Sequence, residues 1–158
     1  MRLCDYDSDQ TSGISHGTLG SNIGFLLLAG WRQAQSEFMS HFKGVDITPA
    51  TFGILHLVAE NPGCAVGQVG RAMGIAANNI ARMVDQLCKR GLLAKTISKG
   101  DARIRTLEIT DSGAQFLREL DERHAVYENA FTAQLGQDRV DALRALLRPF
   151  LKFENPLD

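Results

Sequence analysis

Residues 75–92 constrain the fold most, because their apolar and polar side chains fall on opposite faces of a single helix. At 100° per residue, Ile80, Val84 and Leu87 point to one side, with Met83 at its margin. The other side carries polar and charged side chains, namely Asn78, Arg82, Asp85, Gln86 and Lys89. Asn and Gln can pair with adenine and Arg with guanine, so this face suits a DNA major groove. A polar face that only meets solvent is the alternative.

The segments on either side favour the DNA-binding interpretation. Residues 64–73 predict a short helix, which Gly74 breaks before the two-faced helix begins. Two short helices joined by a glycine-containing turn are typical of a helix-turn-helix. Residues 92–98 and 104–109 are rich in β-branched and apolar side chains and predict two strands. Between them lies a polar turn at 99–103, so the pattern predicts a winged helix-turn-helix.

Charge is concentrated in the same region. The chain has 17 Lys and Arg against 18 Asp and Glu, so it is not basic as a whole. Between Arg71 and Arg105, however, eight basic residues face only two acidic ones, Asp85 and Asp101. A basic module within an otherwise acidic chain indicates a local phosphate-binding surface.

The rest of the chain predicts helices at both ends. Residues 19–42 form one long helix, and residues 48–60 form another that begins with Thr48 as N-cap and Pro49 at its first position. Thr110 is the expected N-cap of a long helix at 111–135, and residues 138–153 form the last helix. These terminal helices carry more apolar surface than one small domain can bury, which indicates a surface for a partner. The alternative is that they cover the core of a monomer.

Short motifs in a fixed order resemble those of MarR-type transcriptional regulators. The matching segments are 47–52 (ITPATF), Pro62–Gly63, 73–75 (MGI), 82–87 (RMVDQL), 90–92 (RGL), 101–103 (DAR) and 107–113 (LEITDSG). The chain departs from the family pattern where Ala65 and Ala76 stand at helix starts that often carry Ser or Thr, and in having a single Arg after Asp101.

The resemblance implies a mainly α fold with a small β-hairpin wing: a winged helix-turn-helix plus long N- and C-terminal dimerisation helices. Residues 1–18 would be a flexible arm, and residues 19–158 a single domain. Within that domain, 47–110 form the DNA-binding lobe, and 19–46 with 111–158 form the dimerisation helices. A two-fold homodimer would place two recognition helices on an inverted-repeat operator in double-stranded DNA.

Two sets of site residues follow. The predicted DNA contacts are Ala77, Asn78, Asn79, Arg82, Gln86, Lys89, Lys99, Asp101, Arg103 and Arg105. The resemblance also implies a small-molecule effector, an aromatic acid or its thioester, that releases a repressor from DNA. Its expected site, where the first, second and fifth helices meet, draws on Phe25, Leu28, Trp31, Arg32, Phe52, His56, Arg118 and His124.

Enzymatic function has little support in the sequence. The four histidines have no nucleophile or carboxylate at a catalytic spacing, and we expect no cofactor, no metal and no catalytic residue. No apolar run approaches the roughly 20 residues of a membrane span, and no signal peptide is evident, so we expect a cytoplasmic protein.

Two other functions remain open from the sequence. One is an oxidant-sensing repressor that uses Cys64 or Cys88, and the other is a winged helix that binds protein instead of DNA. An Arg at the hairpin tip, such as Arg103, favours a narrow DNA minor groove, whereas a protein-binding wing would more often present an aromatic or Leu anchor.

Overall fold

The computed structural model describes residues 14–97 and 105–152, which divide into two compact units with the boundary between Ser40 and His41. These residues are mainly helical with one small antiparallel sheet, which confirms the predicted fold class. In chain order the elements are η1 (Gly17–Ser21), α1 (Ile23–His41), α2 (Pro49–Glu60), β1 (Cys64–Ala65), α3 (Val66–Met73), α4 (Ala77–Lys89), β2 (Leu93–Ile97), β3 (Arg105–Ile109), α5 (Asp111–Leu135), α6 (Gln137–Leu147) and η2 (Arg148–Lys152).

The first unit contains η1 and nearly all of α1. The predicted helix at 19–42 is wrong at its start, because residues up to Ser21 form a 3-10 turn. Asn22 separates the two elements, and its side-chain Oδ1 accepts a hydrogen bond of 3.0 Å from the Phe25 N–H. This N-cap satisfies a backbone donor that the first helical turn leaves open, so the helix begins at Ile23. Large apolar side chains lie exposed along α1, including Leu26, Leu28 and Trp31.

The second unit is built around the sheet, whose strand order is β1-β3-β2. Leu93 pairs with Ile109 and Ile97 with Arg105, which confirms the predicted wing strands. The helix predicted at 64–73 is wrong at its start, because Cys64 and Ala65 pair with β3 as a third strand. Pairing with a strand some forty residues later in the chain overrides the local helical pattern.

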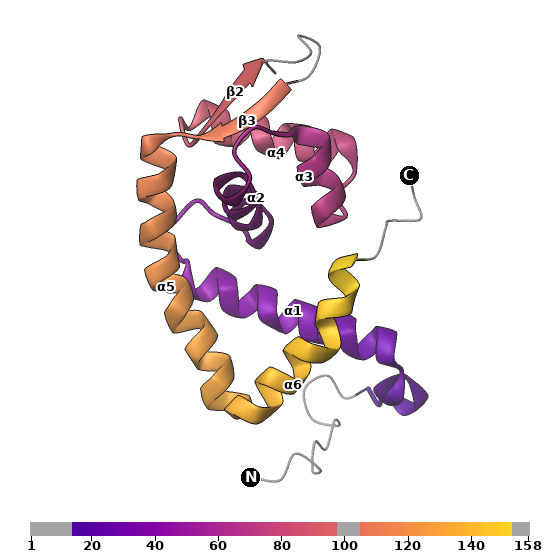
Figure 1. The fold of residues 1–158 in the computed structure, drawn as a ribbon. Coiled ribbons are helices and arrows are strands. Elements are labelled where there is room, and N and C mark those ends of the chain that lie inside the picture. The colour runs from indigo at the N-terminus through magenta and orange to yellow at the C-terminus, as the bar shows by residue number, and fades with distance from the viewer. Residues whose placement is uncertain (1–13, 98–104, 153–158) are drawn as a thin grey trace. The chain divides into compact units, whose positions relative to one another are not determined.

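The core of the second unit comes from helices and sheet together. Fully buried side chains from α2, α4 and β3 meet there, namely Ile54, Leu55, Val58, Val84, Leu87 and Leu107. Figure 1 shows β2 and β3 side by side near α4, and α5 leading from the end of β3 to α6. Within this unit, α5 therefore joins the sheet to α6.

The C-terminal helices follow the predicted bounds in part. Thr110 Oγ1 accepts from the Gly113 N–H at 2.9 Å, and α5 runs from Asp111 to Leu135 as predicted. The single helix predicted at 138–153 is wrong at its end, because α6 stops at Leu147 and η2 follows. Pro149 explains the change, since proline lacks the N–H that would continue the α-helical hydrogen bonds. Within the described ranges, none of the helices has the length and apolar character needed to cross a membrane.

Candidate nucleic-acid interface

Helix α4 has the two faces that its sequence predicts. Ile80, Val84 and Leu87 are at most 1% exposed and hold the helix against the core. Its opposite side lies in solvent and comprises Asn78, Asn79, Arg82, Gln86 and Lys89, whereas Ala77, also exposed, starts the helix on the same side as Val84. Five of the six predicted contact residues of α4 therefore share one exposed surface, which we call the recognition face.

The turn between α3 and α4 has the close packing of a helix-turn-helix. Gly74 ends α3 in the left-handed conformation, with φ of 62°, and Ile75 N–H bonds to the Gly70 carbonyl at 2.9 Å. A Cβ on Gly70 would lie 3.1 Å from Ile80 Cγ2 and 3.2 Å from the Ile75 carbonyl oxygen. Glycines thus let α3 approach α4 closely enough to fix the angle of the recognition face.

The two missing N-caps have different consequences. Neither Ala65 nor Ala76 provides a side-chain cap for the helix that follows it. At α3, Gln68 Oε1 accepts from the Ala65 N–H at 2.8 Å, which supplies half of a capping box. At α4 no side chain caps the first turn, where the Asn79 N–H bonds instead to the Ala76 carbonyl at 2.9 Å.

An ion pair joins the wing to α4. Lys95 Nζ of β2 lies 2.5 Å from Asp85 Oδ1, and this contact lowers the pKa of the Asp85 carboxyl. Sequence reasoning placed Asp85 on the polar face without finding this partner. The pair offsets the negative charge of Asp85 on α4, to which the nearby charge of Lys89 also contributes.

The rest of the wing is described in part. Arg105 begins β3, is exposed, and pairs with Ile97 across the sheet. Lys99, Asp101 and Arg103 lie outside the described residues. Thr96 and Thr106 face each other on adjacent strands, with their hydroxyl oxygens 2.7 Å apart. This cross-strand pair stabilises the strands that carry the tip.

The predicted effector residues belong to both units. Phe25, Leu28, Trp31 and Arg32 lie on α1, where Phe25 is half-buried and the other three are exposed. In the second unit, Phe52 and His56 of α2 meet His124 of α5, with the Phe52 ring 4.5 Å from His56 and 4.8 Å from His124. Arg118 instead donates to Gln115 Oε1 at 2.5 Å along its own helix.

Acidic residues that the sequence analysis missed surround this aromatic and histidine cluster. His56 Nε2 lies 2.9 Å from Asp121 Oδ1, so this contact joins α2 to α5. Burial lowers the pKa of His124, and nearby Glu128 opposes that shift. Asp121, His124 and Glu128 recur at helical spacing on α5, which is the signal that would have grouped them.

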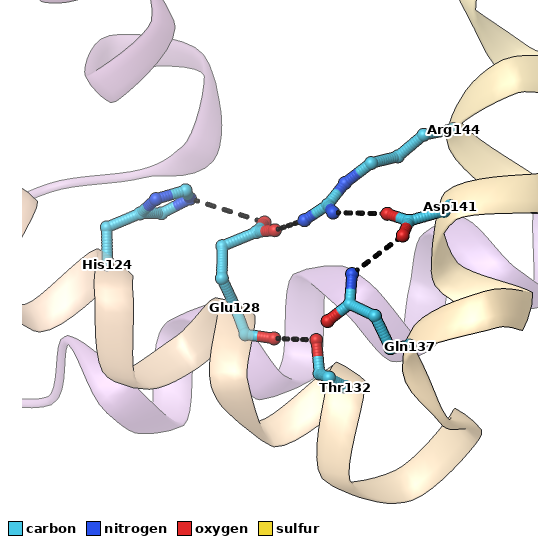
Figure 2. Close-up of polar contacts among 6 residues, drawn as sticks. All are labelled: His124, Glu128, Thr132, Gln137, Asp141 and Arg144. Atoms are coloured by element: carbon cyan, nitrogen blue, oxygen red, sulfur yellow. Dashed lines mark hydrogen bonds and ion pairs between the residues drawn. The ribbon is translucent and has the colours of Figure 1, made fainter.

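Glu128 extends the contacts to the last helix. Figure 2 shows its carboxylate between His124 and Arg144, with the Arg144 guanidinium 2.6 Å away. Arg144 also pairs with Asp141 at 3.2 Å, and Gln137 donates to Asp141 at 2.9 Å. A continuous set of polar contacts therefore runs from α5 to α6.

Neither described cysteine has the environment of a reactive thiol. Cys64 and Cys88 are both half-buried, and burial raises the pKa of each thiol. Cys64 lines an open cavity of about 550 Å³ with residues of α2 and α3, and none of the predicted effector residues lines that cavity. In the described part of the chain, no group of three or more potential ligands is placed to hold a metal ion.

Comparison with known proteins places this geometry in a family. A family model described as the MarR family matches residues 45–104. The solved structure of the transcriptional repressor CouR bound to a 23-mer DNA duplex is 31% identical and superposes with a TM-score of 0.82, covering 88% of this chain and 99% of the other. This chain belongs to the MarR family.

Further relatives of this MarR-family chain are regulators as well. CouR bound to p-coumaroyl-CoA is 29% identical, with a TM-score of 0.80 and coverage of 88% of this chain and 98% of the other. A candidate transcriptional regulatory protein for the hcr operon of Thauera aromatica is 28% identical over 134 residues, which are 84% of this chain and 81% of that protein. These relatives are transcriptional regulators, not enzymes, and the MarR-family chain is likewise a winged-helix transcriptional regulator.

Proposed function

We propose that the chain is a homodimeric repressor that binds an inverted-repeat operator through α4 and the wing. The observation that carries this proposal is the recognition face, where exposed Asn, Gln, Arg and Lys side chains stand opposite a fully buried apolar face. Arg82 is centrally placed on that face, and we assign it to a base edge. Arg103, with Lys99 and Asp101, would act at the wing tip in the minor groove.

The proposed dimer rests on apolar side chains that each unit leaves exposed. On α6 and η2, Leu146 is 72% exposed, Phe150 57% and Leu151 80%. The helix α1 adds Trp31 at 54%. Apolar surface of this extent marks an interface in a soluble protein, and a two-fold partner would supply the second recognition face.

For the effector we propose a small aromatic acid or its coenzyme A thioester. The cluster of Phe52, His56 and His124 brings aromatic and imidazole rings together, a composition that suits a planar ligand with a carboxyl or thioester oxygen. The CouR structure with p-coumaroyl-CoA supports this ligand class at 29% identity. A true effector must bind the DNA-free form more tightly than the DNA-bound form, by the factor by which it weakens operator binding.

Oxidant sensing is not proposed. A sensor thiol needs a lowered pKa, whereas burial raises the pKa of Cys64 and Cys88.

The test of DNA recognition compares Arg82→Ala with Arg139→Ala, which removes an exposed arginine of α6. Operators are first selected from random duplexes with the wild-type protein, and binding is then measured by fluorescence anisotropy. We expect Arg82→Ala to lose about 1–3 kcal/mol of discrimination between the selected operator and one altered at a single base. Arg139→Ala should keep that discrimination. Equal losses on both sequences for Arg82→Ala would assign it to phosphate, and failure of wild type to select any sequence would refute the DNA-binding proposal.

A second measurement tests the dimer. Light scattering over a dilution series should give about twice the 17.3 kDa chain mass. A monomer at micromolar concentration would contradict both the dimer and the inverted-repeat operator.

A further inference from the structure

The end of α4 and the start of α5 are bonded through one side chain, Thr110. Its hydroxyl accepts from the Gly113 N–H at 2.9 Å, which caps α5. The same hydroxyl donates to the Gly91 carbonyl at 2.6 Å, with the Leu92 carbonyl at 3.2 Å. Capping a helix requires only a hydrogen-bond acceptor, which Asp could also supply. The bond to the Gly91 carbonyl requires a donor, which an ionised Asp side chain lacks.

Gly91 and Leu92 belong to the turn that ends α4. Gly91 is left-handed, with φ of 72°, and its N–H bonds to the Cys88 carbonyl at 2.9 Å. Leu92 N–H bonds to the Leu87 carbonyl at 3.0 Å. A hydroxyl bonded to the carbonyls of this turn therefore holds the last turn of the recognition helix itself.

Further contacts close the same joint. The Thr110 N–H bonds to the Leu92 carbonyl at 3.1 Å. The Arg90 guanidinium lies over the Phe116 ring of α5, 5.4 Å from its centre. Because these contacts lie within two helical turns of Thr110 and next to Gly91, they hold the end of α4 against the start of α5.

Because α5 is long, a small tilt of this helix displaces its α4 end by a distance comparable to one base pair. Its 25 residues span about 37 Å at 1.5 Å per residue. If its far end is held in a dimer, a tilt of about 5° moves the joint by about 3 Å, which is close to the rise of about 3.4 Å per base pair of DNA. If the contacts between α4 and α5 are rigid, α4 moves by the same distance. If they are loose, α4 can change its orientation independently of α5.

We propose that Thr110 is a positioning residue that makes α4 follow α5, so that the spacing of the two operator half-sites is set by the tilt of α5. This inference rests on the proposed function, since it needs a dimer that binds an inverted repeat. Thr110 acts without touching DNA, through the backbone carbonyl of Gly91 in the turn that follows α4.

The test selects bound sequences from random duplexes with the full chain and three variants. Thr110→Ser keeps the hydroxyl, Thr110→Val removes it, and Thr110→Asp keeps a cap acceptor for Gly113 without a donor for Gly91. The readouts are the half-site sequence and the distribution of half-site spacings. Urea unfolding of each variant identifies losses of stability.

We expect wild type and Thr110→Ser to accept one spacing and to bind a site lengthened by one base pair about tenfold more weakly, since the DNA must then be twisted to fit. Thr110→Val and Thr110→Asp should select the same half-site, with the penalty for the added base pair reduced to about threefold or less. A merely structural role would weaken binding to all spacings equally. Should Thr110→Val fail to fold, Thr110→Asp decides the question.

If Thr110→Asp keeps the wild-type preference for one spacing, and Thr110→Val does so too where it folds, this inference is wrong while the proposed function still stands. If wild type itself selects no inverted repeat, the proposed function fails, and this inference fails with it. The wild-type arm of the experiment separates the two cases.

Discussion

Gly113→Ala should be among the most destabilising single-methyl substitutions in this chain. A Cβ at position 113 would lie 2.9 Å from both the Leu92 carbonyl carbon and Ile109 Cγ1, and closer still to the Leu92 carbonyl oxygen. Ordinary contacts of this kind begin near 3.4 Å, so the carbonyl carbon must retreat by about 0.5 Å and the oxygen by more. That oxygen accepts the Thr110 N–H, and its neighbour Gly91 accepts the Thr110 hydroxyl.

The magnitude follows from these bonds. Weakening two or three hydrogen bonds of about 1 kcal/mol each, together with overpacking of about 1–3 kcal/mol, exceeds the roughly 1 kcal/mol that alanine gains over glycine in a helix. We therefore expect Gly113→Ala to lower the free energy of unfolding by roughly 2–4 kcal/mol.

Urea denaturation followed by circular dichroism measures this loss against a matched control. Gly67→Ala, in α3, places its Cβ no closer than 3.6 Å to the nearest atom, Arg71 Nη1. It should leave stability unchanged or raise it by up to about 1 kcal/mol. A Gly113→Ala protein within about 1 kcal/mol of wild type would refute the claim that α5 touches the Leu92 backbone so closely.

Two further predictions concern pH. Pairing with Lys95 lowers the folded-state pKa of Asp85, so the pair stabilises the fold above the unfolded-state pKa, and this contribution is lost as pH falls through the folded-state pKa. Asp85→Asn should therefore lose less stability than wild type as pH falls from about 5 to about 2. Parallel losses in urea midpoints would contradict this. Burial lowers the folded-state pKa of His124 below 6.5, so the unfolded chain takes up this proton first and the fold loses stability as pH falls through 6.5. His124→Gln should reduce this loss of stability in thermal unfolding scans, whereas the control His16→Gln, outside the cluster, should keep it. Identical pH profiles for His124→Gln and wild type would show that burial does not suppress protonation of His124.

Local signals in the sequence determined the helices that make up the recognition module. The apolar spacing of Ile80, Val84 and Leu87 set the buried face of α4, since a helix places every third or fourth residue on one side. Gly74 and Gly91 ended α3 and α4 because both positions require a positive φ. Thr110 began α5 at the predicted residue because an N-cap needs only a nearby hydroxyl.

The tertiary structure alone decided the contacts between segments that lie far apart in the chain. Cys64 and Ala65 became a strand because β3 offers them backbone partners. Asp85 and Lys95 sit ten residues apart on a helix and a strand, and His56 and Asp121 on two different helices, so no sequence periodicity relates either pair. The Thr110 hydroxyl was predictable as a cap, but its bond to the Gly91 carbonyl depends on how closely α5 packs against the end of α4. Secondary structure follows from neighbours within a few residues, whereas ion pairs and helix joints follow from packing of the whole unit, which no local pattern encodes.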